Sequence, residues 1–172
     1  MFIKFIKELS VKKILKSSLH NVKPTTLEHT IATVGILIDG TYFEFVDQLI
    51  HEFVNLGIEK ENVKILVFKD KLKKNEILTF PTFTSKEMSW NGHFQQDYIT
   101  EFTNTPFDLL VSYYDLEKTA LLLTTHRSKA FFKVGFSLVD KRLNHLMINT
   151  TVENYKVFTH ELFRYLKILN KI

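Results

Sequence analysis

Two aspartates follow apolar segments that are typical of buried strands, and these residues are the best placed in the chain to do chemistry. Asp39 opens the triplet Asp39-Gly40-Thr41 directly after the run IATVGILI, and Asp115 directly follows FDLLVSYY. Ligands of open parallel sheets bind beyond the carboxyl ends of the strands, near the point where the strand order reverses. Two carboxylates that converge there could hold Mg²⁺ or act as acid and base. The competing interpretation is that each aspartate caps the helix that follows it.

Known catalytic signatures are missing from the chain. The Asp-Gly-Thr triplet resembles the end of the Asp-x-Asp-Gly-Thr signature of haloacid-dehalogenase-type phosphatases, but Leu37 stands where those enzymes have their nucleophilic aspartate. Covalent phosphoryl transfer of that type is therefore excluded. The sequence also lacks a dinucleotide fingerprint, a Walker phosphate loop, a Gly-x-Ser-x-Gly elbow and a His-Glu-x-x-His pair. We therefore expect no cofactor and no metal centre.

The single tryptophan lies in Trp90-Asn91-Gly92, which is typical of a tight turn. Its indole either packs on that turn or forms the stacking wall of a ligand pocket near the sheet edge. The candidate ligand-binding residues are therefore Asp39, Gly40, Thr41, Asp115 and Trp90.

A basic group follows the next predicted helix and could attract a phosphate, but that helix would end at the opposite edge of the sheet. Its members are His126, Arg127 and Lys129.

Strands alternate with helices along the chain, which indicates a mostly parallel sheet covered on both faces. The first unit runs from a strand at 31–38 through a helix at 43–56 to a strand at 63–68. Further strands are expected at 107–114, 130–136 and 145–148, with a short one near 87–89, and further helices at 94–102, 116–125 and 152–168. The prediction is one Rossmann-like three-layer α/β domain over residues 31–172.

The composition is that of a globular protein, with 45% hydrophobic and 24% charged residues. Cysteine is absent, which excludes thiol nucleophiles, disulfides and thiolate metal sites and agrees with a cytoplasmic location. The net charge of +4 is mild, and its excess lies in the first twenty residues. The sequence therefore argues against a nucleic-acid-binding face.

Residues 1–22 are predicted to form a separate basic, amphipathic helix before the domain. Helical spacing relates Phe2, Phe5, Ile6, Leu9 and Lys13, and the apolar residues Ile14 and Leu15 follow. Its lysines are Lys4, Lys7, Lys12, Lys13 and Lys16. We expect this helix to pack on the domain with its lysines in solvent, and the alternative is weak association with an anionic membrane. No apolar run reaches the length of a signal peptide or a membrane span.

Several segments together resemble an uncharacterised family of small proteins from Bacteroidetes bacteria, known only as a domain of unknown function. The resemblance rests on Trp90-Asn91-Gly92, FDLLVSYY at 107–114, KVGF at 133–136 and VDKRLN at 139–144. It covers most of the chain from about Thr33 onward and implies no activity.

A weaker likeness over 107–136 is similar to part of the N-terminal half of heptosyltransferase-like glycosyltransferases. Those enzymes bind the nucleotide sugar with a second Rossmann-like domain, which a chain of 172 residues is too short to contain. Catalysis of that type is therefore not expected.

We interpret the chain as a non-catalytic accessory α/β domain that binds a protein partner or a small ligand. One alternative is a metal-dependent phosphoryl-transfer enzyme or nuclease that uses Asp39 and Asp115, with Asp97 or Asp140 nearby. Another is a peripheral membrane protein that binds through the N-terminal helix.

Overall fold

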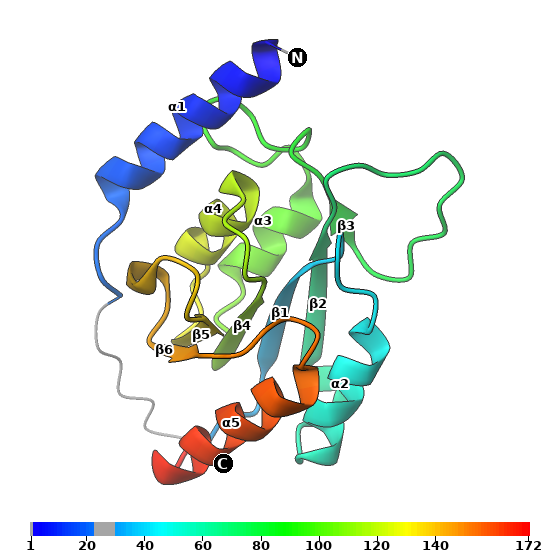
Figure 1. The fold of residues 1–172 in the computed structure, drawn as a ribbon, viewed down its shortest axis with the longest axis vertical. Helices are drawn as coiled ribbons and strands as arrows, with labels where there is room; N and C mark the ends of the chain where they lie inside the picture. The colour runs from blue at the N-terminus through cyan, green and yellow to red at the C-terminus, as the bar shows by residue number, and fades with distance from the viewer. Residues whose placement is uncertain (1, 23–29) are drawn as a thin grey trace.

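A six-stranded parallel sheet forms the centre of the molecule (Figure 1). The computed structural model describes residues 2–22 and 30–172, with side chains from residue 8 onward. The strand order is β3-β2-β1-β4-β5-β6, so the order reverses between β1 and β4, as in doubly wound α/β sheets. The strands are β1 (Val34–Asp39), β2 (Val63–Phe68), β3 (Thr82–Phe83), β4 (Leu109–Tyr113), β5 (Phe132–Phe136) and β6 (Leu146–Ile148).

Helices cover both faces of the sheet and make the fold a three-layer α/β structure. On one face α2 (Val46–Asn55) packs against α5 (Tyr155–Ile168). On the other face α3 (Asp97–Asn104) packs against α4 (Thr119–Arg127), and α1 (Phe2–Ser18) lies outside them against α4. Two short 3-10 helices are η1 (Lys60–Asn62) and η2 (Lys141–Leu143). The predicted α/β class, with a parallel sheet and a preceding helix, is confirmed.

The continuous apolar run of β1 fits a strand that is buried on both faces. All of its residues are buried, and successive side chains enter opposite cores. Ile36 and Ile38 contact the core under α2 and α5, whereas Leu37 enters the core under α3 and α4. This is why β1 reads as an uninterrupted apolar run and shows no polar alternation.

An aromatic cluster fills the core on the α2 and α5 side. The ring centroid of Tyr113 lies 5.1 Å from those of Phe136 and Phe158 and 4.8 Å from that of Phe43. The Tyr113 hydroxyl donates to the carbonyl of Val152 at 2.7 Å. That bond satisfies a polar group that would be costly to bury alone.

The edge strand lies at a different place from the predicted one. β3 is Thr82–Phe83, whereas Met88, in the predicted segment 87–89, makes only an isolated antiparallel bridge with Phe94. Pairing with β2 begins where the Val67 N–H donates to the carbonyl of Pro81 at 2.9 Å. Because proline has no N–H of its own, it cannot continue the ladder toward the start of β2.

α1 packs on the domain, and the side chains of Phe2, Phe5 and Ile6, with which the predicted spacing begins, lie outside the described residues. Val11, Leu15 and Leu19 recur every four residues and are buried against the α3 and α4 side of the core. Leu9, which the spacing groups with Phe2, is 50% exposed. The described lysines of this helix are exposed: Lys12, Lys13 and Lys16. No helix in the described part of the chain is long and apolar enough to cross a membrane.

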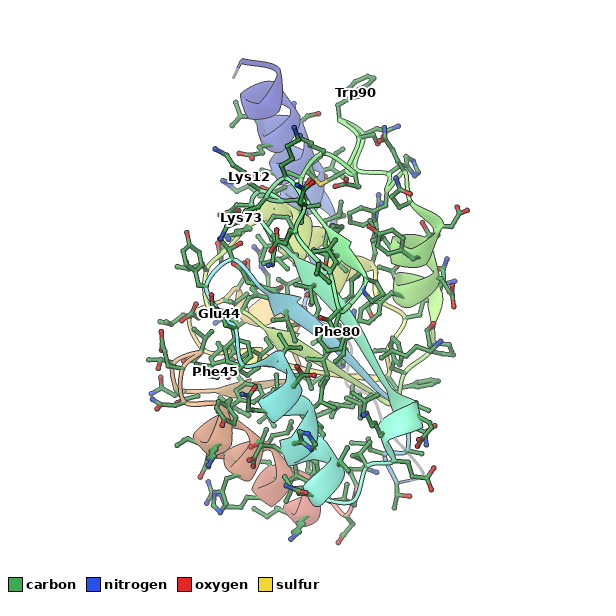
Figure 2. All side chains as sticks on the ribbon, turned by 90° about the vertical axis from the view of Figure 1, so that its right-hand side faces the viewer. Lys12, Glu44, Phe45, Lys73, Phe80 and Trp90 are labelled. Carbon is green, nitrogen blue, oxygen red and sulfur yellow. The ribbon has the colours of Figure 1, made fainter. Side chains whose placement is uncertain are left out.

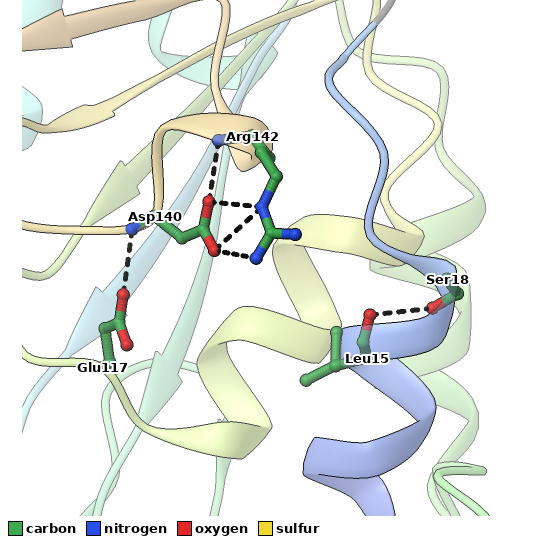
Figure 3. A network of polar contacts seen from close by, with 5 residues as sticks. All are labelled: Leu15, Ser18, Glu117, Asp140 and Arg142. Atoms are coloured by element: carbon green, nitrogen blue, oxygen red, sulfur yellow. Dashed lines mark hydrogen bonds and ion pairs between the residues drawn. The ribbon is translucent and has the colours of Figure 1, made fainter.

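The loop between β5 and β6 is fastened close to the end of α1 (Figure 3). The Asp140 carboxylate accepts the backbone N–H of Arg142 at 2.9 Å and its guanidinium at 2.5 Å, and so caps η2. The Arg142 side chain lowers the pKa of Asp140. The Asp140 N–H donates to Glu117 Oε1 at 3.0 Å, and the Val22 N–H donates to the Arg142 carbonyl at 3.1 Å. Asp140 therefore has a structural role in this loop.

Candidate functional site

The reversal of strand order places the candidate site at the carboxyl edge of the sheet, between β1 and β4. The two strands pair in register, with Ile38 opposite Tyr113. Asp39 ends β1 and Asp115 lies two residues beyond β4, so both leave the sheet at this edge. Gly40 and Thr41 follow Asp39 in the turn that leads to α2.

Asp39 is a buried carboxylate with both oxygens in use. Its Oδ2 lies 2.7 Å from Lys118 Nζ, and its Oδ1 accepts the backbone N–H of Thr41 at 3.0 Å. Only 7% of the Asp39 side chain and 17% of the Lys118 side chain are exposed. A carboxylate at this depth needs such partners, because burying a charge alone is strongly unfavourable.

Lys118 connects Asp39 to the loop after β2. Its Nζ lies 3.1 Å from Asp70 Oδ2 and donates to Thr41 Oγ1 at 3.2 Å. The same Thr41 oxygen accepts the backbone N–H of Asp70 at 3.0 Å. We call Asp39, Thr41, Asp70 and Lys118 the switch-point cluster.

Two aromatic rings lie against the ammonium group of this cluster. Lys118 Nζ is 4.7 Å from the ring centroid of Tyr42 and 5.3 Å from that of Phe68. Such contacts attract a cation to the face of the ring. Phe68 is buried, whereas Tyr42 is 64% exposed and forms the solvent side of the cluster.

Neither aspartate caps a helix, so the capping interpretation is wrong. The N-cap of α2 is Phe45 and that of α4 is Lys118, and neither helix has a side-chain cap. A lysine at this position faces the positive end of the helix dipole. The carboxylates of Asp39 and Asp70 offset that unfavourable placement.

Sequence reasoning missed Lys118 and Asp70. For Lys118 a signal was available, because a cation at a predicted helix start calls for an anionic partner. Asp70 carried no such signal, since it lies in the charged connection 69–74, where a solvated side chain is the ordinary expectation.

Asp115 reaches the same edge but stands apart from the switch-point cluster. It is half-buried, and among the described residues its carboxylate forms no hydrogen bond or ion pair. Residues 8–22 and 30–172 contain no group of three or more acidic or histidine side chains arranged to hold a metal ion. A metal bound by Asp39 and Asp115 would have to displace the Lys118 ammonium.

A polar pocket of about 220 Å³ adjoins the cluster on the side of α2. Its polar groups include Glu44, Asp47 and Lys69, and the segment 77–80 forms another wall. Gly40 contributes its backbone to the lining, and a Cβ there would lie 2.5 Å from Val67 Cγ1. A side chain at position 40 would therefore push β2 away from the turn.

The loop that borders this pocket is fastened by Glu76. Its Oε1 pairs with Lys69 Nζ at 2.5 Å, and its Oε2 accepts the Lys73 N–H at 2.9 Å. The hydrogen bond from Lys69, followed by that from the Lys73 backbone, lowers the pKa of Glu76. The loop thus has a defined shape beside the pocket.

Trp90 lies outside this site. Its hairpin turn is closed by the Gly92 N–H to the Ser89 carbonyl at 3.0 Å and by the Ser89 N–H to the His93 carbonyl at 2.8 Å. The indole is 71% exposed and projects from the end of the molecule away from Glu44 (Figure 2). The expectation of an indole packed on the turn is therefore wrong, and Trp90 does not line the switch-point cluster.

An apolar groove of about 310 Å³ lies at the outer edge of β2, between α2 and α3. Its walls include Ile65, Phe80 and Phe102, with Lys64 and Glu101 at an exposed ion pair of 3.8 Å. Of its polar groups, Lys64 and Glu101 pair with each other, and the Tyr98 hydroxyl donates to the carbonyl of Thr82 at 2.9 Å.

The fold and this edge define a doubly wound α/β domain with an ion-paired polar cluster at its switch point. Residues 7–169 match the model of a family of unknown function, DUF6913, and the chain belongs to that family. The predicted membership of an uncharacterised family is thereby confirmed. No curated protein and no solved structure matches the chain. The heptosyltransferase likeness and the bacterial group stay predictions.

Proposed function

We propose that the chain is a non-catalytic, Rossmann-like binding domain that takes a small polar ligand or a partner segment at its switch point. One observation carries this proposal: the buried Asp39 carboxylate is already neutralised by Lys118 and by the Thr41 N–H. A general base or a metal ligand needs an available carboxylate oxygen. Here the cluster is internally satisfied and shapes the turn beside an open polar pocket, which suits binding.

The pocket gives the proposed ligand a chemical character. Glu44 and Asp47 offer acceptor oxygens, and Lys69 is held by Glu76. A ligand with hydroxyl or amino groups would complement these carboxylates better than a free phosphate would.

A thermal-shift screen of the purified chain tests the proposal. The panel holds Mg²⁺, Mn²⁺, ADP, UDP-glucose, NAD, glucose 6-phosphate, and simple sugars and amines. A compound at 100 times its dissociation constant should stabilise the chain by about 2.7 kcal/mol. For a domain of this size that is a rise in Tm of about 5–10 °C.

Variants then assign any shift to the site. Asp47→Asn should remove the shift produced by a hit, measured against the variant's own unliganded Tm, whereas Lys129→Gln at the far edge should retain it. Turnover of a defined substrate that disappears in Asp39→Asn would overturn the non-catalytic proposal.

The rival function is metal-dependent phosphoryl transfer or nucleic-acid cleavage. What favours it is the register of β1 and β4, which brings Asp39 and Asp115 to one edge. It requires saturable Mn²⁺ binding, measurable by calorimetry, that is lost in Asp39→Asn/Asp115→Asn. Our proposal expects no saturable Mn²⁺ binding, because Lys118 holds the Asp39 carboxylate.

A further inference from the structure

The exposed tryptophan is presented by a structured hairpin at one end of the molecule. Trp90 follows Ser89 at the tip, and Gly92 takes the positive φ of 82° that such a turn requires. An exposed indole leaves a large apolar area in contact with water. Tryptophan at a protein surface is typical of binding sites and of membrane–water interfaces.

The hairpin is fixed from below by the last turn of α4. The Arg127 guanidinium donates to the Gly92 carbonyl at 2.5 Å and lies 6.0 Å from the ring centroid of Phe94. Met88, which bridges to Phe94, is fully buried. The backbone that carries Trp90 is therefore fixed, so that little backbone freedom is lost when the side chain binds.

The outward face of α1 adds positive charge and an apolar residue. Leu9, Lys12, Lys13 and Lys16 lie three, four and seven residues apart, which places them on one face of the helix. All four are exposed, opposite the buried stripe of Leu15. No acidic residue occurs between positions 9 and 22.

Both features lie at the same end of the molecule. Figure 1 places the start of α1 beside the connection between β3 and α3, and Figure 2 labels Trp90 and Lys12 at that end. This end combines a projecting aromatic side chain with a lysine-rich helix face. We call Leu9, Lys12, Lys13, Lys16 and Trp90 the Trp90 face.

We propose that the Trp90 face docks on an anionic lipid bilayer. The indole enters the interfacial region, and the lysines contact acidic headgroups while their methylene stems follow the apolar boundary. A protein partner would have to supply a pocket for a projecting indole, whereas a bilayer accepts the indole without one. Each lysine near an anionic surface strengthens binding by about fivefold.

Trp90 is the only tryptophan of the chain, so its fluorescence reports directly on this face. Full-length protein is titrated with vesicles of phosphatidylcholine containing phosphatidylserine and with vesicles of phosphatidylcholine alone. We expect a blue shift of the emission with the anionic vesicles, quenching by brominated lipid, and co-sedimentation that weakens as salt is raised.

Matched variants distinguish binding through the Trp90 face from binding that depends only on the net charge of the protein. Lys12→Glu/Lys13→Glu/Lys16→Glu should weaken vesicle binding at least about 100-fold. Lys60→Glu/Lys156→Glu/Lys167→Glu alters three exposed lysines elsewhere by the same net charge and should bind as the wild type does. Trp90→Ala should also reduce co-sedimentation, with an unchanged circular dichroism spectrum.

Emission that stays unchanged at saturating anionic vesicle concentration overturns the proposal and leaves this face to a protein partner. Equal losses in the two triple variants also overturn it, because binding would then follow net charge alone. The result is independent of the switch-point site, because no residue of the Trp90 face belongs to that cluster.

Discussion

Lys118, at the switch point, forms ion pairs with two carboxylates that differ in burial. The Asp39 side chain is 7% exposed, whereas that of Asp70 is 42% exposed. Solvent screens the contact with Asp70, so the Asp39–Lys118 pair carries most of the electrostatic free energy. The consequence of removing a partner therefore depends on which charge is left behind.

Lys118→Met should lower the free energy of unfolding by about 2–4 kcal/mol, because it leaves the Asp39 carboxylate buried and unpaired. Asp70→Asn should lower it by less than about 1 kcal/mol. Urea denaturation followed by circular dichroism measures both. Adding Asp39→Asn to Lys118→Met should recover part of the loss. Equal effects of Lys118→Met and Asp70→Asn would contradict the assignment.

A second lysine, Lys133 of β5, is buried without a carboxylate partner among the described residues. Only 6% of the residue is exposed, and its Nζ donates to the Thr125 carbonyl at 2.8 Å, near the C-terminal end of α4. Burial lowers the pKa of its ammonium from 10.5 to about 8. Between these values the unfolded chain holds a proton that the folded chain has released, so stability rises with pH through this window.

Relative to Lys133→Met, the wild type should gain about 2 kcal/mol of unfolding free energy between pH 7 and about pH 9.5. Below about pH 8 both states are protonated and the burial cost is fully present, so most of the gain comes above that value. Urea titrations of both proteins at the two pH values give the difference, and the comparison cancels groups that they share. A difference that does not change with pH would show that Lys133 titrates normally.

The candidate site could be predicted from the sequence only as far as its local pattern extends. Asp39, Gly40 and Thr41 were identified because they follow a buried strand. Lys118 and Asp70 contact Thr41 from 77 and 29 residues away, and no local pattern encodes such pairs. Trp90 was misplaced for the same reason, since the anchoring of its hairpin by Arg127 spans 35 residues.

At the scale of elements, the spacing in α1 predicts a helix more directly than it predicts which face of the helix is buried. Of the spaced residues in its first half, the structure describes the side chain of Leu9, which is 50% exposed, whereas Val11, Leu15 and Leu19 are buried. The stripe follows from where α4 lies, which is a tertiary property.

Leu15→Ala should lower the free energy of unfolding by about 2–4 kcal/mol, because Leu15 is 3% exposed and leaves a cavity. Leu9→Ala makes the same chemical change at a residue that is 50% exposed and should stay within about 0.5 kcal/mol of the wild type. Denaturation midpoints compare the pair. A larger loss of unfolding free energy in Leu9→Ala than in Leu15→Ala would mean that α1 buries a different face.

Close packing of β1 against the loop before β4 depends on Gly35. A Cβ there would lie 2.6 Å from two ring carbons of the buried Phe107. Gly35→Ala should therefore lower the free energy of unfolding by about 1–3 kcal/mol, because the added methyl group overpacks the core. In a Phe107→Leu background the same change should lower the free energy of unfolding by less, because the aromatic ring that the methyl group would meet is absent. Additive effects in this double-mutant cycle would exclude the steric explanation.

For the whole molecule, the sequence predicted the number of layers and the parallel sheet but not the strand order. The βαβ unit of β1, α2 and β2 was evident, because the apolar runs and the helical spacing lie within some 38 residues of each other. Placing β4 on the other side of β1 required contacts across the chain, which periodicity does not show. The two-residue β3 was missed because it is too short for any pattern.

At the scale of the whole molecule, α1 determines whether residues 31–172 are stable when they fold alone. Val11, Leu15 and Leu19 belong to the core under α3 and α4. Burying each side chain contributes about 1.5–3 kcal/mol before the cost of ordering the helix, against a total of about 5–15 kcal/mol for a domain. Removing residues 1–20 should therefore lower Tm by about 10 °C or more.

Removing only residues 1–8 is the matched control, because it retains Val11, Leu15 and Leu19 and should lower Tm by no more than about 3 °C. Circular dichroism melts of the three chains at one concentration make the comparison. If the chain that begins at residue 21 has the same Tm as the full-length protein, the packing of α1 on the core contributes no stability. If it melts well below while the shorter deletion does not, α1 is an integral part of the fold, and its lysines have a fixed position relative to Trp90.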